Sequence, residues 1–93
     1  MRKLWLDDAW NDYVSWQTED KKTIKRINKL IKDIERNGYN GIGKPEALKG
    51  TLVGWWSVKI DDANRIVFKI SGESNDSEKI LEIYACKGHY DDK

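Results

Sequence analysis

The chain has one histidine, His89, which stands near the end of the sequence beside Tyr90. Histidine suits proton transfer because its unperturbed pKa lies closest to neutral pH. Tyr90 adds a ring face on which a nucleobase can stack and a hydroxyl that can form a hydrogen bond. A lone histidine is more often structural or exposed than catalytic, so the pair is a weak signal by itself.

Glu46 and Lys49 are the next candidates, and they follow the only proline, Pro45. A carboxylate can serve as a general base when an acidic proton lies within its reach. In a loop a carboxylate usually faces solvent, so this segment gains meaning only from a larger pattern.

Two further cations, Lys59 and Arg65, flank a turn-like segment, Asp61-Asp62-Ala63-Asn64. If residues 61–63 form a three-residue loop, Lys59 and Arg65 face each other on one side of a hairpin. Like charges opposed across two strands are unfavourable unless an anion lies between them. This register predicts a phosphate clamp, whereas another register would leave both side chains in water, and pairing alone does not decide.

Several other kinds of site are poorly supported. One cysteine, Cys86, and one histidine cannot form a structural zinc site, and no compact acidic motif points to magnesium. The sequence has no phosphate-binding glycine loop, dinucleotide fingerprint, Ser/His/Asp set or Cys/His set. We therefore expect no metal and no cofactor, and an enzyme built from these residues would use acid–base chemistry and electrostatics.

Ninety-three residues suffice for one domain but not for two independent cores. With 39% hydrophobic residues and five tryptophans, the chain can form a core although 35% of its residues are charged. We expect one domain over residues 1–90 and a short tail over residues 91–93. Cys86 has no disulfide partner, and no apolar run suits a signal peptide or membrane span, so the sequence predicts a cytoplasmic protein without membrane contact.

The first part of the chain predicts a strand and a helix. Residues 2–6 lean apolar, as in a short strand, and one of the two aspartates that follow is expected to cap a helix. Trp10, Tyr13 and Val14 recur at helical spacing, which predicts that they pack in the core.

A second helix is predicted after Glu19 or Asp20, and the Asn37-Gly38 pair is expected to end it. Its apolar stripe comprises Ile24, Ile27, Leu30 or Ile31, and Ile34. The predicted helix contains seven basic residues and only two acidic ones, although the whole chain carries a net charge of only +1. Such a face favours RNA phosphate, although an ordinary solvated helix face would look similar. The candidate phosphate contacts of this face are Lys21, Lys22, Lys25, Arg26, Lys29 and Lys32.

The second half of the chain predicts an aperiodic loop followed by strands. Residues 39–50 are rich in glycine, and strand-like runs follow at 55–60, 65–70 and 79–87. Two helices against one face of a small sheet make an α+β fold.

Four motifs together resemble one family. They are the Gly43–Lys49 segment (GKPEALK), Trp56-Ser57, Arg65-Ile66-Val67 and Cys86-Lys87-Gly88-His89-Tyr90. Over about residues 4–90 the chain is similar to the YoeB (Txe) branch of the RelE/ParE toxin superfamily. The resemblance implies two N-terminal helices packed on a small, twisted, mostly antiparallel sheet.

The resemblance also implies a function and partners. Such toxins belong to type II toxin–antitoxin pairs and are mRNA interferases, which cut mRNA in the ribosomal A site and inhibit translation. The implied partners are a cognate YefM/Axe-like antitoxin, the 70S ribosome and mRNA. A homodimer is also compatible with the resemblance, although the sequence shows no self-complementary patch.

Carried over residue by residue, the resemblance makes Glu46 the general base and His89 the general acid, with Arg65 stabilising the transition state. The 2′-hydroxyl of RNA would be the nucleophile, so the chemistry needs no metal and predicts a 2′,3′-cyclic phosphate. The remaining implied site residues are Lys49 and Lys59, which would hold the phosphate, and Tyr90, which would orient the substrate.

The chain departs from this branch at Val58 and Lys59, where two arginines are common. We expect Val58 to weaken phosphate or ribosome contacts, and lysine lacks the bidentate fork of arginine. Residues 71–78 form a longer and more acidic connection than usual, and the Asp91-Asp92-Lys93 tail is additional.

Two rival functions stay open. One is a ParE-like toxin of the same fold that poisons gyrase without cutting RNA. The other is an RNA-binding or regulatory domain without catalysis.

Overall fold

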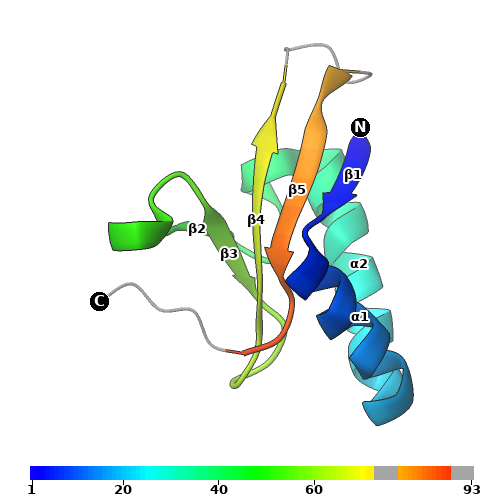
Figure 1. Ribbon diagram of the computed structural model, residues 1–93. Coiled ribbons are helices and arrows are strands. Elements are labelled where there is room, and N and C mark those ends of the chain that lie inside the picture. Colours follow the sequence, from blue (N-terminus) through cyan, green and yellow to red (C-terminus); the bar gives the residue numbers. More distant parts are fainter. Residues whose placement is uncertain (73–77, 89–93) are drawn as a thin grey trace.

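The computed structural model describes residues 1–72 and 78–88, which form a helical layer against a sheet (Figure 1). The α+β fold expected from the sequence is confirmed. The elements are β1 (Arg2–Trp5), α1 (Asp7–Glu19), α2 (Lys21–Asn37), the 3₁₀ turn η1 (Gly38–Asn40), β2 (Glu46–Ala47), the 3₁₀ turn η2 (Gly50–Leu52), β3 (Trp56–Lys59), β4 (Arg65–Ser71) and β5 (Ile80–Ala85).

The five strands are ordered β1-β5-β4-β3-β2. β1 runs parallel to β5, and the other three neighbouring pairs are antiparallel, so the sheet is mostly antiparallel as expected. Strand β2 was not predicted, because two residues are too few to show the alternation by which a strand is recognised in a sequence. It extends the sheet through the pairs Glu46–Ser57 and Ala47–Trp56.

The two helices begin in different ways. Asp20 caps α2 by accepting hydrogen bonds from the backbone N–H groups of Lys22 and Thr23 at 3.0 and 3.4 Å. The residue before α1 is Leu6, which provides no side-chain cap, so the prediction of an aspartate cap there was wrong. The two aspartates, Asp7 and Asp8, lie inside the first turn instead. Their negative charges stabilise the helix there, because the N-terminal end of the helix dipole is positive.

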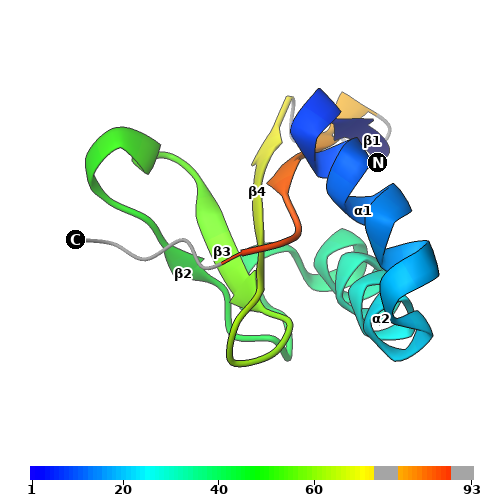
Figure 2. The same ribbon diagram turned by 60° about the horizontal axis from the view of Figure 1, so that its bottom comes forward.

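The core lies between α2, α1 and one face of β3, β4 and β5. Figure 2 shows both helices on the same side of the molecule, with the β2–β3 hairpin directed away from them. The predicted apolar stripe of α2 is confirmed, since Ile27, Ile31 and Ile34 are at most 5% exposed. The sheet contributes the buried residues Val58, Ile60, Ile66, Phe68, Leu81 and Ile83.

The aromatic residues of α1 correct one expectation. Trp10 and Val14 are 49% and 45% exposed, so they are not core residues. Helix α1 turns Ala9 and Trp16 inward instead, and Trp10 joins Trp5 and Tyr13 in a cluster at the edge of the core. The spacing of apolar residues was helical, but which face is buried depends on how α1 packs against β5 and α2.

No helix within residues 1–72 and 78–88 is long and apolar enough to cross a membrane.

Candidate active site on the helix-distal sheet face

The sheet face opposite the helices carries Glu46, Ser57, Lys59, Arg65 and Val67, and we call it the distal face. Glu46 pairs with Ser57, and Ser57 pairs with Val67, which places these three residues in one cross-strand row. Lys59 pairs with Arg65 in the next row on the same face. The structure therefore decides the hairpin register that the sequence leaves open, and three of the predicted site residues share one face.

Lys59 and Arg65 are opposed like charges, and the chain itself supplies an anion beside one of them. The Lys59 ammonium lies 2.8 Å from the Asp62 carboxylate. The hydrogen bond from Lys59, together with its charge, lowers the pKa of Asp62. Both side chains are exposed, so the ion pair between Lys59 and Asp62 is weak.

Glu46 and Lys49 are exposed on either side of a buried anchor, Leu48. The Leu48 backbone N–H donates to the Trp55 carbonyl at 2.9 Å, and its side chain is only 6% exposed. The segment predicted as a loop is thus fixed to β3, and it presents the Glu46 carboxylate at the edge of the distal face.

Arg65 lies on the distal face and forms a backbone hydrogen bond with Gly88, the last described residue. Its side chain is half-buried, and its backbone N–H donates to the Gly88 carbonyl at 2.9 Å. His89 and Tyr90 follow Gly88 but lie outside the described residues, as do the 91–93 tail and most of the 71–78 connection. Their roles stay predictions.

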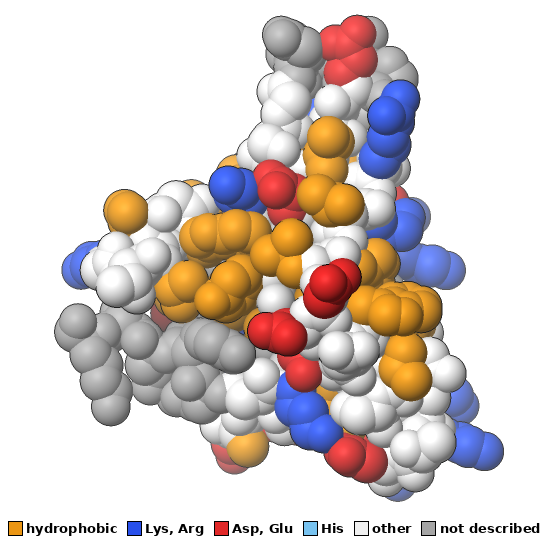
Figure 3. Space-filling model, in the orientation of Figure 1, with side chains coloured by type: hydrophobic (Ala, Val, Ile, Leu, Met, Phe, Trp, Pro, Cys, Tyr) orange, Lys and Arg blue, Asp and Glu red, His pale blue; other side chains and the backbone are white. Residues whose placement is uncertain are grey.

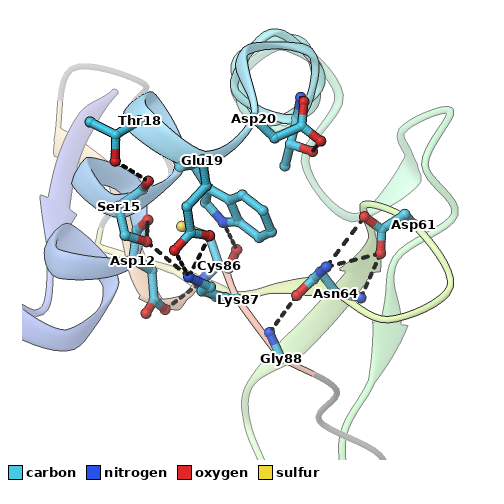
Figure 4. Close-up of polar contacts among 12 residues, drawn as sticks. Asp12, Ser15, Thr18, Glu19, Asp20, Asp61, Asn64, Cys86, Lys87 and Gly88 are labelled. Carbon is cyan, nitrogen blue, oxygen red and sulfur yellow. Dashed lines mark hydrogen bonds and ion pairs between the residues drawn. The ribbon is translucent and has the colours of Figure 1, made fainter.

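Cys86 and Lys87 are held to α1 by polar contacts (Figure 4). The Trp16 indole N–H donates to the Cys86 carbonyl at 2.9 Å, and the Cys86 N–H donates to the Asp12 carboxylate at 3.1 Å. Lys87 donates to Glu19 at 2.8 Å. Burial raises the pKa of Asp12, against the opposing effect of the hydrogen bond from Cys86.

The turn between β3 and β4 holds the same segment from the other side. The Asn64 side-chain oxygen accepts a hydrogen bond from the Gly88 N–H at 2.8 Å. Sequence reasoning assigned Asp61–Asn64 to a turn only and did not single out Asp12 or Asn64. The Asp-x-x-Asn spacing indicates a side-chain-stabilised turn, but nothing in it identifies Gly88 as a partner.

Val58 lies on the other side of β3. It is 1% exposed in the core, and a Cβ atom on Gly43 would collide with its methyl group. Alternation points the Val58 side chain toward the helices, so it lies away from the distal face, and its expected effect on phosphate or ribosome contacts stays a prediction.

The predicted basic face of α2 is exposed and borders two grooves. One, of about 490 Å³, is lined by Lys25, Lys29, Lys32 and Arg36 together with Ile42. The second, of about 370 Å³, runs past Arg26 and Lys29 to Lys59. Positive charge thus continues from the helix to the edge of β3.

An aromatic pair, Trp55 and Tyr84, lies on the distal face. The rings of Trp55 and Tyr84 are 5.2 Å apart, and the Lys69 ammonium lies 4.7 Å from the Trp55 ring. Figure 3 shows hydrophobic side chains gathered over β3, β4 and β5, with charged groups around them.

Within the described ranges, no three His, Cys, Asp or Glu side chains gather as ligands for a metal ion.

This combination of fold and surface matches a known class of protein. A family model described as YoeB-like toxin of bacterial type II toxin-antitoxin system matches residues 5–90, and the chain belongs to this family. Among its relatives, Toxin YoeB of Escherichia coli K12 is 42% identical over 97% of this chain and all of the relative. Toxin YoeB of Streptomyces coelicolor is 52% identical with the same coverage.

Solved structures agree with this assignment. A YoeB/ParE toxin from Agrobacterium tumefaciens superposes with a TM-score of 0.90 at 40% identity, covering 97% of this chain and 100% of the other. The YoeB-YefM complex from Staphylococcus aureus gives 0.82 at 37% identity, covering 97% and 98%. YafQ from E. coli, at 12% identity and a TM-score of 0.74, shares the fold alone.

Cys86 provides a chemical test of how tightly the segment before Gly88 is packed. Burial, with a smaller contribution from the Asp12 charge, raises the pKa of the thiol from 9.0 to about 12. The thiolate is the reactive form, so Cys86 in the folded protein should react with iodoacetamide at pH 8 about 1,000-fold more slowly than an exposed thiol. Mass spectrometry measures the rate, and a Val53→Cys variant supplies the reference because Val53 is 73% exposed. Equal labelling rates at positions 53 and 86 would contradict this packing.

Proposed function

We propose that the chain is an endoribonuclease that cuts mRNA in the ribosomal A site, in the manner implied by its resemblance to the YoeB branch. The observation that carries the proposal is the strand register, in which Glu46, Lys59 and Arg65 share one sheet face. The backbone contact between Arg65 and Gly88 also brings the chain to this face immediately before His89.

The proposed reaction uses the RNA as its own nucleophile. Glu46 takes the proton of the 2′-hydroxyl, whose oxygen attacks the adjacent phosphorus. The bond from phosphorus to the 5′-oxygen breaks, and His89 gives a proton to that departing oxygen. The products are a 2′,3′-cyclic phosphate and a 5′-hydroxyl, and the residues supply proton transfer without a metal ion.

The cations stabilise the charge of this reaction. Arg65 acts on the phosphoryl oxygens, where negative charge builds in the transition state. Lys49 and Lys59 hold the phosphate, and Tyr90 orients the substrate. The exposed basic residues of α2 bind ribosomal RNA through its phosphates and dock the toxin in the A site.

Substitution of two site residues tests the mechanism. We expect Glu46→Gln to slow cleavage about 10²–10⁴-fold, because the amide cannot accept the proton. Arg65→Lys should slow it about 10²-fold, because the bidentate donor is lost. Primer extension on translating ribosomes measures the cleavage. The matched control is Glu78→Gln, which changes an exposed glutamate two residues before β5.

Three results of that assay would contradict the proposal. They are intact message with the wild-type protein, undiminished cleavage by Glu46→Gln, and cleavage of a message whose scissile nucleotide is 2′-deoxy. Inhibition of gyrase by a protein that leaves the message intact would favour the ParE-like alternative.

The basic face of α2 makes its own prediction. Substitution of Lys25 and Lys29 with glutamine removes two charges and should weaken binding to the 70S ribosome. In a plot of the logarithm of the binding constant against the logarithm of salt concentration, the steepness of the slope should fall by about 1 for each lost phosphate contact. Lys3→Gln removes one charge from β1, where Lys3 pairs with Glu35, and should leave the slope unchanged. Equal slopes for all variants, measured by cosedimentation across a salt series, would refute the RNA contact.

We further propose a YefM/Axe-like antitoxin as partner, because related chains are solved as YoeB-YefM complexes, one of them a heterotetramer, and one relative as a YoeB dimer. An antitoxin segment that covers Glu46 or Arg65 should abolish cleavage. Size-exclusion chromatography with light scattering measures the stoichiometry, and cleavage by the purified complex at the rate of the free toxin would contradict this mode of inhibition.

A further inference from the structure

The turn that joins β3 to β4 is organised by the side chains of Asp61 and Asn64. The Asp61 Oδ1 atom accepts hydrogen bonds from the backbone N–H groups of Ala63 and Asn64, both at 2.8 Å. The Asn64 Nδ2 group donates to both carboxylate oxygens of Asp61, at 3.1 and 3.3 Å. The carboxylate therefore fixes which way the Asn64 amide points, with its nitrogen toward Asp61 and its oxygen away from it.

The Asn64 oxygen is directed at Gly88, as Figure 4 shows. It accepts the Gly88 N–H at 2.8 Å, while the Gly88 carbonyl accepts the Arg65 N–H at 2.9 Å. Both backbone polar groups of Gly88 are thus held by consecutive residues of β4 and its turn. Gly88 has a φ of +93°, which an L side chain rarely adopts, so glycine allows the chain to enter this position without strain.

Within residues 1–72 and 78–88, the polar contacts from α1 reach as far as Lys87, whose side chain is partly exposed to solvent. The backbone of Gly88 is therefore fixed by the turn and the start of β4, because its N–H donates to Asn64 and its carbonyl accepts from Arg65. Asn64 and Asp61 are half-buried, which reduces the competition of water for these bonds.

We propose that Asn64, oriented by Asp61, is a positioning residue for the cleavage reaction. It fixes the backbone at Gly88 beside Arg65, and so fixes the point from which the chain continues to the general acid, His89. This inference rests on the function proposed above. His89 lies outside the described residues, and the argument uses only the position of Gly88.

The expected defect of Asn64→Ala is specific to proton donation. Small displacements of a catalytic group are costly, so the single-turnover rate on saturating ribosomes should fall about 10- to 100-fold. The ribosome concentration that gives half the maximal rate should stay within about twofold, because Asn64 is not among the basic residues of the docking face.

An exchange of the two side chains provides a matched rescue. The double variant Asp61→Asn with Asn64→Asp keeps an oxygen at position 61 for the turn and an oxygen at position 64 for the Gly88 N–H. The amide and carboxylate still form a hydrogen bond to each other, with donor and acceptor exchanged. We expect the exchange to restore most of the rate, whereas Asn64→Asp alone opposes two carboxylates and should not.

A chemically altered substrate separates proton donation from general damage to the fold. When sulfur replaces the bridging 5′-oxygen at the scissile bond, a thiolate leaves without needing a proton. Wild type, His89→Ala and Asn64→Ala should then cut the sulfur substrate at similar rates, although both variants are slow on the ordinary one. Circular dichroism melting of each variant checks that it is folded.

The outcomes distinguish the two proposals. If Asn64→Ala is equally slow on both substrates, or unaffected on both, or if a folded exchange variant is not rescued, the positioning role is overturned while the nuclease proposal stands. If the wild type cuts neither substrate, or if sulfur fails to rescue His89→Ala, the proposed function itself fails and the inference fails with it.

Discussion

The register of the β3–β4 hairpin is the constraint on which the rest of the site depends. Successive side chains of a strand point to opposite faces, so a slip of one residue would turn Arg65 into the core and Ile66 out of it. The four-residue turn from Asp61 to Asn64 prevents that slip, because Asp61 binds the backbone at both of the last two positions. The turn thus sets which side chains are available for chemistry.

This register divides the sheet between two tasks. One face supplies Val58, Ile66 and Phe68 to the core against α1 and α2, where burial of apolar surface stabilises the fold. The other face carries Glu46, Lys59 and Arg65, whose charges would be costly in the core. Substitutions on the distal face should therefore have little effect on the stability of the domain, and substitutions in the core should have little effect on the candidate site. The exceptions are the turn and Gly88, which contribute to both.

The sequence predicted the features that follow from periodicity. The apolar stripe of α2 follows from a regular repeat and is present. Strand alternation also offered the opposition of Lys59 and Arg65, but only as one of two registers, and the structure decides in its favour. Periodicity could not find β2, which is two residues long, nor decide which face of α1 is buried, because Trp10 and Trp16 are equally apolar in the sequence.

The candidate site was only partly accessible to the same reasoning. Glu46 and His89 gained their predicted roles from family resemblance, since their local sequences are also those of ordinary exposed residues. The bond from Asn64 to Gly88 joins residues 24 positions apart, and such a pairing is set by tertiary structure. Asp12 likewise meets Cys86 across 74 positions, and no local pattern in the sequence encodes that contact.

The position of β5 has a consequence for biosynthesis. β5 is the last strand of the described chain, yet it lies between β1 and β4 and joins the first strand to the rest of the sheet. Until β5 has been synthesised and inserted, β1 lacks the neighbour with which it pairs, and Gly88 cannot reach Arg65. A chain that lacks β5 therefore has no assembled candidate site, so this site can form only after its last described strand has been synthesised.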